Sequence, residues 1–106
     1  MKINRQKVFE KFNGHCAYCG DELELKKMHV DHILARLRGG ENNYSNYNPA
    51  CISCNASKST YTIEEFRERL IADVDRLRRD SAKFRILERF GIVSQTKTVL
   101  KFYFEK

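Results

Sequence analysis

Two Cys-x-x-Cys pairs constrain the fold of this chain more than any other feature of its sequence. The first pair is Cys16 and Cys19, and the second is Cys51 and Cys54. Each short turn can present two thiolates at about 2.3 Å from one Zn²⁺, so the two pairs together fill every position of a tetrahedral site. A zinc site with no open position is structural, and we expect it to hold the fold together.

Two disulfides are the alternative use of four cysteines. The sequence contains no apolar run of the length that a signal peptide or a membrane span requires. We therefore expect a cytoplasmic protein with no membrane partner. Thiols stay reduced in that compartment, which favours zinc over disulfides.

The length and the charge of the chain indicate how many domains it has and what kind of partner it binds. Its 106 residues suit one domain with one core. It carries 20 Lys and Arg residues against 14 Asp and Glu residues, a formal net charge of +6. A basic chain favours a polyanionic partner, although charge alone is a weak argument.

The spacing of apolar residues predicts an α+β fold. We expect a helix over 3–13 that stops at Asn13-Gly14, a strand over 23–34, a loop over 36–48, an extended piece over 48–50 and a short helix over 53–59. Together these elements make a ββα unit clamped by zinc, with a core at about 14–60 and an extension at about 61–106.

The extension is predicted to be mainly helical. Thr62 and Glu65 have the spacing of a capping box, so a long helix should begin there, and a second helix should end at Gly91. The alternating tail from 98 to 104 predicts a strand, although the sequence does not name its partner. A helical stripe is formed by Phe66, Leu70, Val74 and Leu77. This stripe is either core or a dimer seam, which leaves monomer and homodimer both open.

The pair Asp31-His32 offers the groups for hydrolysis. A neutral imidazole with a pKa of about 6.5 can take a proton from water near neutral pH. The adjacent carboxylate is a hard ligand that suits Mg²⁺ or Mn²⁺. Taken alone, such a pair is more often an ordinary surface pair. Strict strand alternation would also send the two side chains to opposite faces, so the strand must end or bend here.

The spacing of the residues that follow His32 argues against an ordinary surface pair. The chain resembles the HNH endonucleases, the zinc-bound branch of the ββα-metal (His-Me finger) nucleases, over about residues 14–60. The matching positions are Cys16, Cys19, Asp31, His32, Gly39, Gly40, Asn46, Cys51, Cys54, Asn55 and Lys58. Many relatives have Pro where this chain has Ala35 and Leu where it has Tyr47, which affects the loop more than the chemistry.

The resemblance implies a role for each of these polar side chains. His32 would be the general base, and Asp31 with the side-chain carbonyl of Asn55 would hold one catalytic Mg²⁺ or Mn²⁺ ion. Asn46 would pin the Gly-rich loop to the strand that presents His32, unless it is an ordinary turn residue. Weak metal binding without substrate should follow from so few protein ligands.

Three basic residues are expected near the substrate. Arg36 and Arg38 could grip phosphates from the loop, as could Lys58 from the short helix, but each could also be a solvated charge. His29 could adjust Asp31 or contact nucleic acid, although an exposed strand histidine is favoured. His15 could bind the zinc ion only if one of the four cysteines did not, and all four are present in the sequence.

From this resemblance we expect a metal-dependent HNH endonuclease that cuts DNA by nicking or double-strand cleavage. The small phage-type members are similar, so phage packaging or another DNA-processing pathway could supply partners. A zinc-stabilised module that binds nucleic acid without cutting it is the alternative. A third hypothesis keeps the nuclease chemistry, with RNA or a branched junction as the substrate.

Overall fold

The structure is a computed structural model that describes residues 3–94 and 99–106. Its regular elements, in chain order, are α1 (Arg5–Glu10), η1 (Leu25–Lys27), β1 (His29–His32), η2 (Arg36–Arg38), η3 (Tyr44–Asn46), β2 (Tyr47–Ala50), α2 (Ile52–Lys58), α3 (Ile63–Asp80), α4 (Ala82–Arg89) and η4 (Tyr103–Glu105). Of the helices in the described ranges, none is long and apolar enough to cross a membrane.

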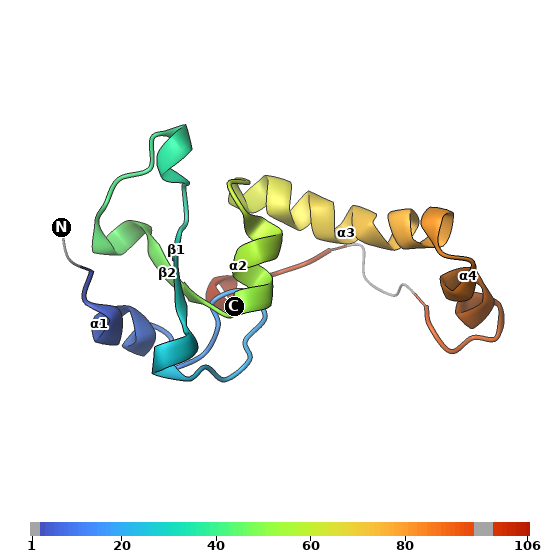
Figure 1. The fold of residues 1–106 in the computed structure, drawn as a ribbon, viewed down its shortest axis with the longest axis horizontal. Helices are drawn as coiled ribbons and strands as arrows, with labels where there is room; N and C mark the ends of the chain where they lie inside the picture. Colours follow the sequence, from blue (N-terminus) through green and yellow to red (C-terminus); the bar gives the residue numbers. More distant parts are fainter. Residues whose placement is uncertain (1–2, 95–98) are drawn as a thin grey trace.

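The predicted ββα unit is confirmed. β1 and β2 pair antiparallel, with Asp31 opposite Asn48 and His32 opposite Tyr47, and α2 follows directly after β2. Figure 1 shows α2 standing beside this two-stranded ribbon. The α+β class is therefore correct, and the unit places the end of β1 close to α2.

The core lies where the first cysteine turn meets the ββα unit. The backbone N–H of Ala17 donates to the carbonyl of Pro49 over 2.8 Å, which attaches the turn to the end of β2. The buried members of this core are Cys16, Ala17, Tyr18, Ala50, Phe66 and Phe102. A second, smaller cluster of Val8, Met28 and Tyr47 holds α1 against the strands. The first cysteine turn is thus part of the core itself.

The long helix begins with the predicted capping box. The amide of Glu65 donates to the Thr62 hydroxyl over 3.2 Å, and the Thr62 amide donates to the Glu65 carboxylate over 2.9 Å. Phe66 is buried in the core, whereas Leu77 is 49% exposed. Figure 1 shows the reason, because α3 leaves the ββα unit and carries α4 at its far end. The apolar stripe is therefore core only in its first half.

The tail does not form the predicted strand. Thr98 lies outside the described residues, and residues 99–102 are irregular before the turn η4. The amides of Tyr103 and Phe104 instead donate to the carbonyls of Tyr18 and Ala17, over 3.0 and 2.8 Å. The tail thus docks on the first cysteine turn, where two hydrogen bonds and the buried ring of Phe102 replace a strand ladder.

The first predicted strand is also shorter than expected. β1 spans only His29–His32, because residues 25–27 form the turn η1. The guanidinium of Arg5 in α1 donates to the carbonyls of Leu25 and Met28, both over 2.8 Å, and these bonds hold the turn. Such a long-range contact is invisible to a local pattern.

Candidate metal centre and active site

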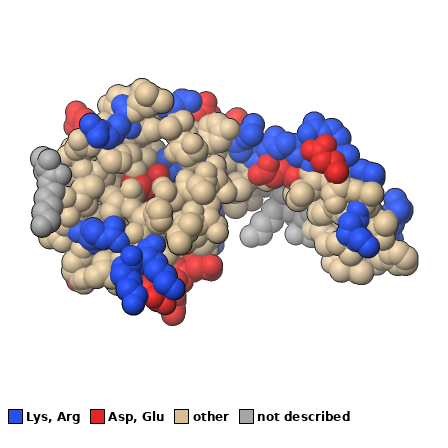
Figure 2. Space-filling view, viewed as in Figure 1, with Lys and Arg blue, Asp and Glu red and all other residues tan. Residues whose placement is uncertain are grey.

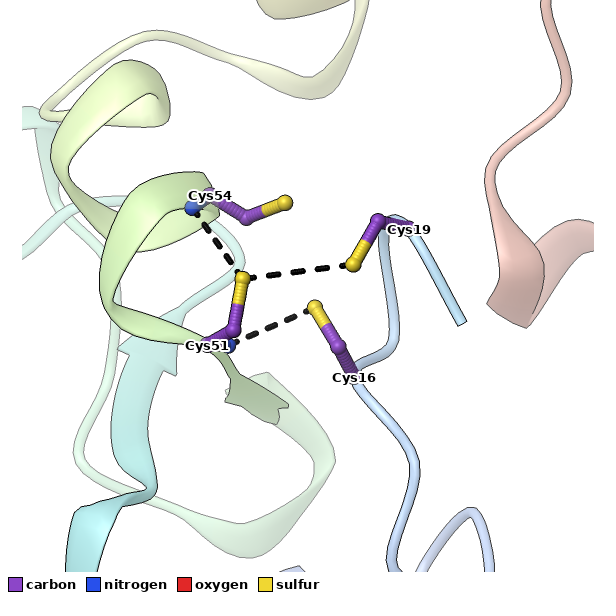
Figure 3. A group of neighbouring side chains, drawn as sticks. All are labelled: Cys16, Cys19, Cys51 and Cys54. Atoms are coloured by element: carbon purple, nitrogen blue, oxygen red, sulfur yellow. Dashed lines mark hydrogen bonds between the residues drawn. The ribbon is translucent and has the colours of Figure 1, made fainter. Parts of the chain in front are cut away.

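The four cysteines meet at one point, as predicted. Their Sγ atoms all lie within 4.8 Å of one another, and the Sγ atoms of Cys19 and Cys51 are 3.9 Å apart. Sulfurs at the corners of a zinc tetrahedron stand about 3.8 Å apart, whereas a disulfide needs about 2.05 Å. All four are free thiols, so the disulfide alternative is excluded in this structure. Figure 3 shows the two pairs facing each other.

The second pair is presented by the start of α2. Cys51 is the N-cap of that helix, and its Sγ accepts a hydrogen bond from the amide of Cys54 over 3.3 Å. The amide of Cys51 in turn donates to the Sγ of Cys16 over 3.4 Å. The hydrogen bond with the Cys54 side chain, helped by backbone N–H groups, lowers the pKa of Cys16 to about 4. Amides aimed at sulfur favour thiolate, the form that binds metal.

Asp31 lies at the inner face of β1, only 5% exposed. Its Oδ2 accepts a hydrogen bond of 2.5 Å from the hydroxyl of Tyr18, which stands between the first two cysteines. Burial raises the pKa of Asp31, and the bonds from Tyr18 and Lys58 act in the opposite direction. Burial also raises the pKa of Tyr18, so the phenol keeps its proton and donates it to this bond.

The expectation that Lys58 contacts phosphate does not agree with the structure. Its side chain is fully buried, and its Nζ lies 3.2 Å from Oδ2 and 3.4 Å from Oδ1 of Asp31. The same ammonium donates to the backbone carbonyl of His32 over 2.9 Å. Lys58 is therefore an internal counter-ion, because its position on the inner side of α2 directs it toward the strand.

His32 is the last residue of β1 and is half-buried. Its ring packs edge-on against Tyr47, its cross-strand partner, with 5.1 Å between the ring centroids. Its Nε2 lies 2.9 Å from the Oδ1 of Asn42 in the loop. With the amide oriented in this way, Nε2 carries the proton and Nδ1 keeps its lone pair.

Asn46 makes the contacts that a loop-holding residue requires. Its Oδ1 accepts from the amide of Leu34 over 2.9 Å, and its Nδ2 donates to the carbonyls of Leu34 and Glu41, both over 3.0 Å. These bonds join the turn before β2 to the chain just after His32.

Four of the predicted residues share one open pocket of about 290 Å³ between the end of β1, the turn η2 and the end of α2. Asp31, His32 and Asn55 all line it, as do Arg36 and Leu37. β1 ends at His32, so the neighbouring Asp31 and His32 can serve one pocket although one is buried and the other is not.

Asn55 reaches this pocket from α2. Its Nδ2 lies 3.1 Å from the Nδ1 of His29, an exposed residue of β1. Its carbonyl oxygen is therefore the group left to accept from a substrate or bind a cation. Asp31 lines the same pocket, and its carboxylate, like this carbonyl, is a hard oxygen donor of the type that suits Mg²⁺ or Mn²⁺.

The two loop arginines differ in position. Arg36 lines the pocket, whereas Arg38 makes a 3.0 Å ion pair with Glu65 at the start of α3. Arg38 is therefore already paired with a carboxylate in this structure, and Arg36 is the arginine of the loop that faces the pocket.

Sequence reasoning missed several contacts of this site. Tyr18 was not predicted to touch Asp31, Asn42 was not predicted to touch His32, and His29 was not predicted to touch Asn55. The only signal for the first is an aromatic residue with a hydroxyl inside a Cys-x-x-Cys turn, and for the last it is the shared strand face of His29 and Asp31.

Comparisons with known proteins agree with this geometry. The family model described as HNH endonuclease matches residues 16–60. YoqL of Bacillus subtilis (strain 168), a candidate HNH endonuclease derived from the SPbeta prophage, is 37% identical over 78 residues, which cover 60% of this chain and 31% of that protein. The chain thus spans about a third of the length of this curated relative.

A solved structure shares the fold. The Type II-C Cas9 enzyme from Actinomyces naeslundii superposes with a TM-score of 0.57 and 22% identity, over 80% of this chain and 10% of that chain. The family match, the ββα unit and the clustered cysteines lead to the same conclusion. Over residues 16–60 this chain is similar to the HNH endonuclease family in its sequence, its ββα fold and its four clustered cysteines.

Proposed function

We propose that this chain is a metal-dependent endonuclease that hydrolyses DNA phosphodiester bonds. The observation that carries the proposal is the pocket shared by Asp31, His32 and Asn55, which come from β1 and α2. The family match supports nuclease chemistry, and the names of YoqL and of the Cas9 enzyme are consistent with it. The net charge of +6 favours a polyanionic substrate.

His32 acts as the general base in this proposal. Nε2 is held by Asn42, so Nδ1 is the nitrogen that takes a proton from the attacking water. The edge-on contact with Tyr47 and the bonds of Asn46 to Leu34 fix the ring and the chain that follows it. This support keeps the base in one orientation while water attacks phosphorus.

Asp31 and Asn55 hold the divalent ion in this proposal. When bound, that ion supplies positive charge to the phosphate and to the leaving oxygen. Tyr18 and Lys58 fix the Asp31 carboxylate, and Lys58 neutralises part of its charge. We therefore expect weak binding of Mg²⁺ in the absence of DNA, because the carboxylate already has a cation beside it.

A plasmid nicking assay tests the proposal. The parent protein should nick supercoiled DNA with added Mg²⁺ or Mn²⁺ and should stop when a chelator removes them, while His32→Ala should lose activity. His15→Gln is the matched control, because His15 does not line the pocket, and it should keep the activity.

Other outcomes would give a different function. If parent and variant bind DNA equally and neither cuts it, the chain is a zinc-stabilised binding module and the proposal fails. A panel of single-stranded RNA, duplex DNA and branched DNA checks the substrate, and a preference for RNA or for junctions would overturn duplex DNA as the main substrate.

A further inference from the structure

An apolar side chain stands in the open beside the proposed active site. Leu37 is 85% exposed, more than any other large apolar residue reported for the described part of the chain. One exposed leucine is ordinary on a protein surface. Its surroundings are what make Leu37 unusual, because it lines the same pocket as His32 and Asn55.

The turn that carries Leu37 is firmly built. The amides of Arg38 and Gly40 both donate to the carbonyl of Ala35, over 2.9 and 3.0 Å. Gly40 packs so closely on the chain that a Cβ there would lie 1.7 Å from the carbonyl oxygen of Leu34. The ion pair of Arg38 with Glu65 ties the turn to α3. The turn is thus held by its own backbone hydrogen bonds, and it presents the side chain of Leu37 outward.

Positive charge beside Leu37 favours a nucleic acid at this turn. Arg36 precedes Leu37 in the sequence and lines the pocket, whereas Arg38 on the other side is paired with Glu65. A phosphate that enters the pocket to reach His32 would bring the neighbouring nucleotides to the turn. Proteins that deform DNA commonly insert an apolar residue such as leucine between base steps while basic residues hold the backbone.

We propose that Leu37 is a wedge that enters the base stack of duplex DNA next to the scissile phosphate and opens the backbone toward the pocket. This inference rests on the proposed function, since it takes duplex DNA as the ligand. The unstacking is favourable only because Arg36, which precedes Leu37 and lines the pocket, binds phosphate at the same time. Leu37 then contributes to the choice of cutting site through the ease with which a step unstacks.

Fluorescence of a base analogue tests the wedge without any cleavage. A short duplex in which 2-aminopurine replaces several adenines is titrated with protein in buffer without added divalent ions. The parent protein should raise the fluorescence, because unstacked 2-aminopurine is brighter. Leu37→Ala should lose most of this rise while it keeps most of its affinity. Ile92→Ala removes a side chain that is 70% exposed and lies after α4, so it should behave as the parent does.

Cleavage gives the second measurement. Leu37→Ala should cut an intact duplex several-fold more slowly than the parent, and a mismatched pair at the cut position should restore most of the rate, because a mismatch lowers the cost of unstacking. An equal fluorescence rise in the parent and in Leu37→Ala would overturn the wedge. So would a defect in Leu37→Ala that the mismatch does not relieve.

The two proposals fail in different ways. A parent protein that brightens the duplex but never cuts it supports the wedge and removes the nuclease function. A parent protein that cuts, together with a Leu37→Ala variant that cuts and brightens equally well, removes the wedge and leaves the nuclease function intact.

Discussion

The ammonium group of Lys58 is buried between α2 and the end of β1, where it contacts both oxygens of Asp31 and the carbonyl of His32. A lone charge at such a place would be costly, so each member of the pair depends on the other. The pair also joins the helix that carries Asn55 to the strand that carries His32. One buried contact therefore links all parts of the proposed catalytic site.

Replacement of Lys58 alone should therefore destabilise the fold more than replacement of both Lys58 and Asp31. Lys58→Met should lower the free energy of unfolding by about 3–5 kcal/mol, because it leaves a buried carboxylate without its counter-ion. The same change in an Asp31→Asn background should cost clearly less. Denaturant unfolding at saturating zinc measures both, and equal losses in the two backgrounds would contradict the pairing.

At the scale of elements, the loop between β1 and β2 depends on Asn46. Its side chain replaces backbone partners for Leu34 and Glu41, which lie on opposite sides of the glycine pair. No strand pairing joins these segments within the described loop, so the hydrogen bonds of the Asn46 side chain hold them together.

Asn46→Ala should slow cleavage by up to about 100-fold, since a displacement of about 1 Å at a catalytic group can cost that much. Zinc content and DNA affinity should change little. Asn43→Ala is the matched control in the same loop, because the Asn43 side chain accepts from nearby Ser45 and donates to nearby Glu41 and does not reach Leu34. Single-turnover cleavage compares the two, and equal rates would contradict the loop-holding role.

The tail is a separate element that completes the core. The ring of Phe102 stacks on Phe66 with 5.1 Å between centroids and meets Tyr18 edge-on at 5.4 Å. Arg67 closes over it and donates to the carbonyl of Leu100 and to both oxygens of Glu105. The tail thus covers the ring whose hydroxyl holds Asp31.

Phe102→Ala should lower the free energy of unfolding by about 3–5 kcal/mol, because it opens a cavity in the core. Phe90→Ala removes a ring that is 77% exposed, so it should be close to neutral. Thermal and denaturant unfolding of the two variants at equal zinc provide the measurement. A stable Phe102→Ala protein would mean that the tail is not part of the cooperative core.

The sequence was sufficient for the features that local chemistry determines. Spacing predicted the cysteine cluster, and the capping box located the start of α3 to within one residue. It was insufficient where contacts span the chain. Alternation in the tail suggested a strand, but the cysteine turn offers only two hydrogen bonds there. The charge on Lys58 suggested an exposed side chain, although its partner is 27 residues away in the sequence.

At the scale of the whole molecule, the cysteine cluster holds the parts together. It joins the turn that presents Tyr18 to the helix that presents Asn55 and Lys58. The far half of α3 and α4 contribute little to this assembly. In this arm Arg76, Arg78 and Arg79 are each paired with a carboxylate of the arm, and Figure 2 shows acidic and basic side chains mixed along it. This pairing makes the end of α3 a poor surface for tracking a phosphate backbone.

Purified protein should hold about one zinc ion per chain through dialysis. A strong chelator under denaturing conditions should release it, and refolding without zinc should lose the ββα unit, because binding of zinc by thiolates supplies folding free energy in sites of this type. Metal analysis and far-ultraviolet circular dichroism follow both steps. A metal-free protein with an unchanged spectrum would show that the four cysteines do not form a structural zinc site.

The docking of the tail onto the first cysteine turn has a consequence for synthesis in the cell. Residues 102–104 leave the ribosome long after residues 17 and 18, yet they cover the same side chains. A nascent chain that has not yet released them carries an unfinished core around Tyr18. We expect chains interrupted before that point to be inactive, so that the proposed nuclease activity arises only from products that include this late segment.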